Sequence, residues 1–150
     1  MCLALDMRFT RDMLPYDEKR ARRDAELIDA KVLSNRRPPY TFAGGLYDAL
    51  KATNGDVVVA TNAQARRAGK LFKELEGIDI HPAPAVALAS LIKMVESGSI
   101  DKDACIMLNI TGAGEEAAKK NRELFYLKPI KTFSLNVTVD EVVNYVETLF

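Results

Sequence analysis

The stretch that most constrains the fold of this chain runs from Glu76 to Gly114. It contains an apolar, small-residue run that predicts a buried helix over Ala85–Val95, a short polar interruption, and a second apolar run, Ala104–Ile110. The second run is too short for an isolated helix and is followed at once by Thr-Gly-Ala-Gly, so it predicts an interior strand of a parallel sheet. Thr111 would then lie at the carboxyl end of that strand, where the loops of open α/β sheets line a ligand crevice.

The rest of the chain alternates predicted helices with shorter apolar runs. Val57–Ala60 predicts a second buried strand, and the alternation in Lys131–Val137 predicts a half-exposed or edge strand. Capping boxes at Thr61 and Thr138 predict helix starts, and we interpret Asn54-Gly55 as a helix stop rather than a hairpin turn. Helices are predicted over residues 17–33, 46–53, 62–76, 85–95, 115–125 and from 139 onward.

This order of elements predicts an α/β fold, a three-layer sandwich around a mainly parallel sheet. We expect one region over residues 1–150, made of a lead-in helix (1–33), an α/β core (34–126) and a C-terminal strand and helix (127–150). Met1–Leu5 looks like an element cut off from something upstream.

Charge and composition exclude several classes of partner. Lysine plus arginine equals aspartate plus glutamate at 21 each, so no net field draws the chain onto nucleic acid or an anionic membrane. The mixed charges of residues 17–26 therefore indicate a solvated helix face rather than an RNA-binding one. Neither a membrane-spanning run nor a signal-peptide pattern is present, which predicts a cytoplasmic protein. Cys105 is expected to be a small buried hydrophobe.

Each candidate site residue has a plainer alternative. Thr111 and Gly112 could bind a ligand, or Thr111 or Gly112 could simply cap the following helix. Arg36 and Arg37, in a proline-rich loop, could clamp a phosphate or sulfonate, or lie on an ordinary surface loop. Glu76 ends a helix where the dipole favours a cation, which is compatible with a functional role.

His81 is the only histidine in the sequence and has no second candidate ligand at a metal-binding spacing. We interpret it as a loop residue and expect no metal site.

The ordered pattern E-G-I, P-A-x-A and T-G-x-G resembles the pyridoxal 5'-phosphate (PLP) enzymes of the threonine synthase and tryptophan synthase β-subunit type. Within that group, the chain is most similar to the cysteate synthase family. The segments that carry this similarity are S-N-R-x-P-P-Y, G-G-L-Y-D-A-L, T-N-A-Q-A, E-G-I-D-I and M-L-N-I-T-G. The match covers about Leu33 to Gly114, just over half of the chain. Ala113 and Pro84 depart from the pattern of the family, in the loop after Thr111 and at the helix start respectively.

This resemblance implies a fold-type-II PLP enzyme, with residues 34–126 on the cofactor side. It implies that Thr111, Gly112 and Glu76 contact the cofactor, Thr111 through the pyridine nitrogen. The Schiff-base lysine and the phosphate-binding loop of the family lie upstream of the matched segment. No catalytic lysine is therefore expected in this chain, which we interpret as the C-terminal part of a longer enzyme or a divergent short homologue, inactive by itself.

The reaction implied by the resemblance is a β-replacement in coenzyme M biosynthesis of methanogens: O-phospho-L-serine and sulfite give L-cysteate and phosphate. The expected partners are these small molecules and further copies of the chain in a homo-oligomer, with Arg36 and Arg37 as a candidate substrate-anion site. Two alternatives stay open. One is a threonine synthase-like enzyme, and the other is a non-catalytic α/β module that binds an anion or a partner.

Overall fold

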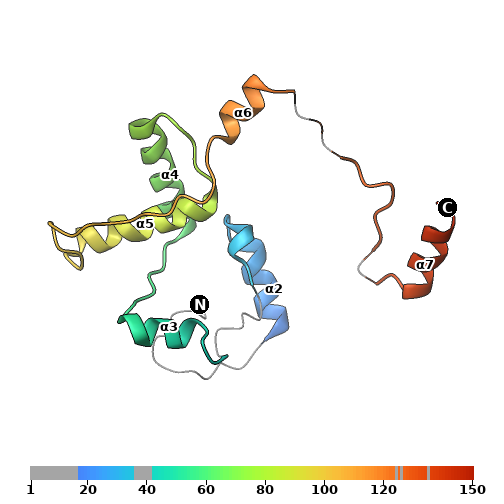
Figure 1. Cartoon of the computed structure of the whole chain (residues 1–150), viewed down its shortest axis with the longest axis horizontal. Helices are drawn as coiled ribbons and strands as arrows, with labels where there is room; N and C mark the ends of the chain where they lie inside the picture. The colour runs from blue at the N-terminus through green and yellow to red at the C-terminus, as the bar shows by residue number, and fades with distance from the viewer. Residues whose placement is uncertain (1–16, 36–41, 124, 126, 135) are drawn as a thin grey trace.

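The computed structural model describes residues 17–35, 42–123, 125, 127–134 and 136–150. Its regular elements are helical (Figure 1). In chain order they are α2 (Glu18–Leu27), the short 3-10 helix η1 (Lys31–Leu33), α3 (Leu46–Thr53), α4 (Asn62–Glu76), α5 (Pro82–Glu96), α6 (Glu115–Asn121) and α7 (Val139–Glu147).

The helix pair α4–α5 forms the packed centre of the described chain. The predicted capping box starts α4, because the Thr61 hydroxyl accepts a hydrogen bond from the Gln64 amide and the Gln64 side chain accepts one from the Thr61 amide. Gly77, at φ +73°, ends α4 in the left-handed conformation. Small residues let the two helices approach closely. Apart from Pro84, the buried apolar side chains of the described residues are alanines: Ala30, Ala65, Ala68, Ala85 and Ala89.

Predicted helix starts and ends were also confirmed in α2, α3 and α7. Asp17 caps α2 by accepting a hydrogen bond from the Arg20 amide at 3.1 Å, although α2 ends at Leu27 rather than near Leu33. Asn54, in the left-handed conformation, ends α3 as a helix stop. Thr138 forms the second predicted capping box at the start of α7.

The predicted sheet is wrong. Among the described residues no β-strand forms, and the only β-pairing is one isolated antiparallel bridge between Ile80 and Ala113. Residues 57–60 and 104–110 carry no regular structure. The three-layer sandwich with a mainly parallel sheet is therefore not the architecture of this chain.

The physical reason is that a strand needs a neighbouring strand to pair its backbone N–H and C=O groups, whereas a helix satisfies them internally. An apolar run indicates only that its side chains favour burial, and here that burial does not occur. Met107 is 95% exposed, and Cys105 is exposed rather than buried. The edge strand predicted over Lys131–Val137 is also absent from its described residues, where the Phe133 ring instead packs edge-on against Tyr145 at 5.6 Å. Leu135 lies outside the described residues.

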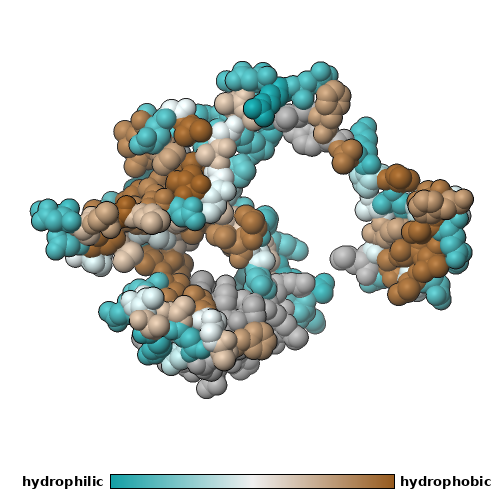
Figure 2. All heavy atoms as spheres, viewed as in Figure 1, coloured by the Kyte–Doolittle hydropathy of each residue, from teal (hydrophilic) through white to brown (hydrophobic). Residues whose placement is uncertain are grey.

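Apolar side chains gather on the outer surface of the α4–α5 pair and on α7 (Figure 2). On α4, Leu71 and Leu75 are 41% and 72% exposed, and in the loop that follows Ile78 is 40% exposed. None of the described helices is both long and apolar enough to cross a membrane.

Candidate functional site

The two motifs that carry the resemblance, E-G-I-D-I-H and T-G-A-G, lie side by side. The bridge between Ile80 and Ala113 pairs them in antiparallel order. The His81 amide donates to the Gly112 carbonyl at 2.9 Å, and the Gly114 amide donates to the Asp79 carbonyl at 2.8 Å. Two backbone hydrogen bonds therefore fix the T-G-A-G loop against the segment between α4 and α5.

Asp79 also holds the start of α6. Gly114 is the N-cap residue of α6 and has φ +77°, a conformation that favours glycine. The Asp79 carboxylate accepts from the Glu116 amide, with both oxygens at 3.3 Å. A carboxylate at this position satisfies an otherwise unpaired amide and complements the positive end of the helix.

The imidazole of His81 lies against the same loop. Its Nε2 atom is 3.3 Å from a carboxylate oxygen of Glu115, the first residue of α6. The pKa of Glu115 lies below its ordinary value, chiefly because Lys119 donates a hydrogen bond to it and adds a favourable charge, with a smaller contribution from His81. Glu115 therefore presents a carboxylate beside the imidazole.

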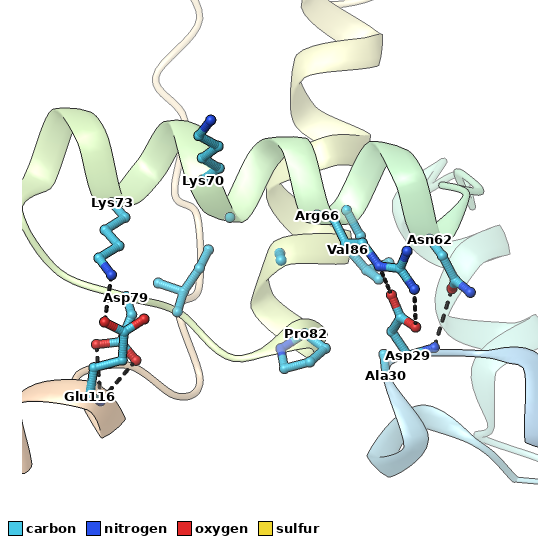
Figure 3. A pocket seen from close by; sticks show the side chains of 14 residues that line it. Asp29, Ala30, Asn62, Arg66, Lys70, Lys73, Asp79, Pro82, Val86 and Glu116 are labelled. Carbon is cyan, nitrogen blue, oxygen red and sulfur yellow. Dashed lines mark hydrogen bonds and ion pairs between the residues drawn. The ribbon is translucent and has the colours of Figure 1, made fainter. Parts of the chain in front are cut away.

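A groove of about 340 Å³ lies beside this loop (Figure 3). Its apolar lining includes Ala65 and Gly69 of α4, Ala85 and Val86 of α5, and Ile80 between the two helices. Charged and polar groups stand at its two ends, with Asp29, Asn62 and Arg66 at one and Lys73, Asp79 and Glu116 at the other (Figure 3).

At one end of the groove, the Arg66 guanidinium donates to both oxygens of Asp29, at 2.6 and 2.8 Å. This hydrogen bond is the main reason that the pKa of Asp29 lies below its ordinary value and that of Arg66 above it. Asn62 adds a second link, accepting from the Asp29 amide and donating to the Leu27 carbonyl. The end of α2 is thereby tied to the start of α4.

At the other end of the groove, Lys73 donates to Glu116, and this hydrogen bond is the first cause of the raised pKa of Lys73. Lys70, between the two ends, lies 3.9 Å from Glu74. The three cations that line the groove each have a carboxylate partner, and Asp79 adds a further acid. The groove therefore has no surplus of positive charge, which argues against it as an anion-binding site.

The structure brings Thr111 and Gly112 into the junction but does not make either of them a helix cap, because Gly114 takes that position. Thr111 is exposed, and no described residue forms a hydrogen bond with its hydroxyl. Glu76 is the last residue of α4, exposed, just before the left-handed Gly77. Arg36 and Arg37 lie outside the described residues.

Sequence reasoning missed two residues of this junction, Asp79 and His81. Asp79 contacts the start of α6, and His81 was interpreted as a simple loop residue although it contacts both Gly112 and Glu115. The available signal was their alternation around Ile80, which places both side chains on one side of an extended segment. No group of three or more potential metal ligands is present in the described part of the chain.

Comparison with known proteins finds cysteate synthases of methanogens among the similar chains. The chain is 43% identical over 134 residues to a cysteate synthase of Methanosarcina barkeri, and 46% identical over 134 residues to one of Methanosarcina mazei, in each case over 88% of this chain and 32% of the relative. A cysteate synthase of Methanosarcina acetivorans is 47% identical over 125 residues, which is 83% of this chain and 30% of the relative. No family model and no solved structure matches the chain.

The resemblance to cysteate synthase predicted from the sequence is therefore confirmed, and it covers more of the chain than the motifs alone indicated. The chain spans about a third of the length of the curated relatives it matches.

Proposed function

We propose that this chain forms the cofactor-side part of a PLP-dependent cysteate synthase-like enzyme, which converts O-phospho-L-serine and sulfite to L-cysteate and phosphate. The observation that carries the proposal is the junction itself. The two motifs shared with this family are joined by the Ile80–Ala113 bridge, and next to that bridge Thr111 presents a hydroxyl with no partner among the described residues.

The exposed Thr111 hydroxyl fits the ring nitrogen of PLP. It can donate a hydrogen bond to a neutral pyridine nitrogen, and an alcohol does not hold that nitrogen in the protonated form as a carboxylate would. When bound, PLP supplies the conjugated system that allows a group to leave and another to add at the β-carbon of an amino acid. Elimination and addition at that carbon do not require a fully protonated ring, so a hydroxyl partner is sufficient.

The other groups follow from the same proposal. Gly112 follows Thr111 directly and carries no side chain. Glu76 is the last residue of α4, next to the loop that begins at Gly77 and leads into the junction. Arg36 and Arg37 remain the proposed site for the substrate anion. The lysine that carries the cofactor is assigned to the part of the relatives that precedes the matched segment, so this chain contributes binding groups. We also propose a cytoplasmic homo-oligomer in a methanogen, acting in coenzyme M biosynthesis.

A segment exchange tests the proposal. The matched part of the Methanosarcina mazei cysteate synthase is replaced by the corresponding residues of this chain, and the chimaera is assayed for cysteate formed from O-phospho-L-serine and sulfite. PLP binding is measured by the absorbance of the bound cofactor. We expect the chimaera to bind PLP and to form cysteate only when sulfite is present.

Two controls make the result specific. The chimaera with Thr111→Val should lose PLP affinity while the Thr111→Ser variant keeps it, since only the latter retains a hydroxyl. Borohydride reduction of the isolated chain with PLP, followed by peptide mapping, should find no stoichiometric, site-specific pyridoxyl-lysine. A folded chimaera that binds no PLP would refute the proposal, and threonine formation without sulfite would favour a threonine synthase-like enzyme.

A further inference from the structure

We propose that His81 is a positioning residue that holds Gly112 and, through it, sets the direction of the Thr111 hydroxyl. This inference rests on the proposed function, because it assigns a task to His81 at the same site. It is carried by three contacts that the residue makes with the T-G-A-G loop and the helix after it: a backbone hydrogen bond, a packing contact and the approach of the imidazole Nε2 to the Glu115 carboxylate.

Backbone hydrogen bonds hold the T-G-A-G loop on both sides of the bridge. The His81 amide donates to the Gly112 carbonyl at 2.9 Å, so the peptide unit after Gly112 is held against the start of α5. The Gly114 amide, bonded to Asp79, holds the other side of the bridge. Thr111 lies immediately before this clamped segment, outside the hydrogen bonds but next to them.

The imidazole covers the face of Gly112. Ring atoms Nδ1 and Cγ of His81 lie 2.7 and 3.1 Å from the position that a Cβ on residue 112 would occupy. The far side of the ring, Nε2, is 3.3 Å from the Glu115 carboxylate. The ring therefore spans the loop from Gly112 to the first residue of α6 and limits movement of the backbone between them.

His81 is itself held by a rigid support. It is the N-cap residue of α5, with extended backbone angles of φ −68° and ψ 162°, the region required of a residue that precedes proline. Its carbonyl accepts a hydrogen bond from the amide of Ala85, whose side chain is buried. The packed α4–α5 pair thus fixes the position of the imidazole.

Thr111 needs such a support because its hydroxyl has no described hydrogen-bond partner to orient it. Its direction follows from its own backbone, and that backbone is fixed by the residue after it. A hydroxyl that is aimed before the cofactor binds loses less entropy on binding. Removing the imidazole should therefore reduce PLP affinity through Gly112 and Thr111, without a direct contact between His81 and the cofactor being required.

The first measurement uses the chain without cofactor. Amide hydrogen exchange is followed by NMR in the wild-type chain and in the His81→Ala and His81→Gln variants. We expect exchange at residue 81 and Gly114 to rise about tenfold in His81→Ala, because the bridge opens more often. A glutamine side chain can donate to Glu115 from the same position, so His81→Gln should stay near wild type. The Ala85 amide is the internal control, since its exchange reports on the start of α5.

The second measurement uses the chimaera described above. His81→Ala should weaken PLP binding by about tenfold and His81→Gln by much less. Arg67→Ala, a change at an exposed residue of α4 outside the groove, is the matched control and should leave PLP binding unchanged. Rescue by glutamine separates a positioning role from a general loss of stability.

The outcomes distinguish the two proposals. Faster exchange together with weaker PLP binding in His81→Ala supports the inference. Unchanged exchange, or faster exchange with unchanged PLP binding, overturns it while leaving the proposed function intact, provided that Thr111→Val still weakens PLP binding. If Thr111→Val has no effect either, the proposed function fails, and the inference fails with it. Faster exchange at Ala85 to the same extent would show fraying of α5 and would also overturn the inference.

Discussion

The ring of His81 occupies the space that a side chain on Gly112 would need: a Cβ there would lie 2.7 Å from Nδ1. Contacts this short do not occur between a real Cβ and a ring atom, so one of the two groups would have to move. Glycine at position 112 is thus required by a neighbouring side chain rather than by an unusual backbone angle, since Gly112 is not among the glycines with positive φ.

Gly112→Ala should destabilise the chain by about 1–3 kcal/mol, the usual cost of forcing an extra methyl group into a filled space. The physical reason is that the imidazole must leave its place beside Glu115. Urea denaturation monitored by circular dichroism measures the change. The double variant His81→Ala/Gly112→Ala should lose less stability than the sum of the two single changes, because the clash is absent. Strict additivity would contradict this explanation.

Gly69→Ala should have the opposite sign. Gly69 lies inside α4, where a Cβ would meet the Ala85 Cβ at 3.6 Å and the Ile80 Cγ1 at 3.9 Å, both ordinary van der Waals distances. Alanine is favoured over glycine within a helix by about 1 kcal/mol, so the variant should gain stability on that order. The same urea titration checks it, and a loss of stability would show that α4 and α5 cannot accept the methyl group.

Thr111→Val should separate binding from stability. Because Gly114 caps α6, removal of the Thr111 hydroxyl should change the free energy of unfolding by less than about 0.5 kcal/mol, as at other exposed positions. In the chimaera, an unpaired ring nitrogen costs about 1–3 kcal/mol, which is roughly 10- to 100-fold in PLP affinity. Thr138→Ala, which removes a true N-cap, is the stability control and should cost about 1 kcal/mol. A stability loss equal to that of Thr138→Ala would return Thr111 to a capping role.

Acid should release the contact between Arg66 and Asp29. The hydrogen bond from Arg66 lowers the pKa of Asp29 below its ordinary value of 3.8, so the carboxylate stabilises the folded chain above the unfolded pKa. That contribution is lost as the pH falls through the lower folded pKa, which places the loss between about pH 5 and pH 2. Unfolding free energies measured across this range should fall more steeply for the wild-type chain than for Asp29→Asn. Parallel curves would contradict the prediction.

Much of the helical structure could be predicted because its signals are local. The capping box at Thr61, the cap at Asp17 and the left-handed stop at Asn54 each depend on residues within one turn of the helix, and all three were confirmed. The prediction of a sheet failed because strand pairing depends on residues far away in the sequence. Runs such as 57–60 and 104–110 show hydrophobicity but carry no information about a partner strand.

The candidate site was predicted in part for the same reason. The E-G-I and T-G-x-G motifs could be identified as pieces of one family pattern. Their contact, however, depends on a bridge between Ile80 and Ala113 that no local sequence signal predicts. His81 appeared ordinary since its role depends on a glycine distant in the sequence. The assignments of Thr111, Gly112, Glu76 and the Arg36–Arg37 pair stay predictions.

The two charged ends of the groove have a consequence for how the chain opens. Arg66 and Lys73 both belong to α4, yet their partners, Asp29 and Glu116, belong to segments on either side of the α4–α5 pair in the sequence. A fluctuation that unwinds α4 therefore breaks a contact to the segment after α2 and a contact to the start of α6 at the same moment. These three segments should behave as one cooperative unit in native-state exchange, with a common opening free energy despite their separation along the chain.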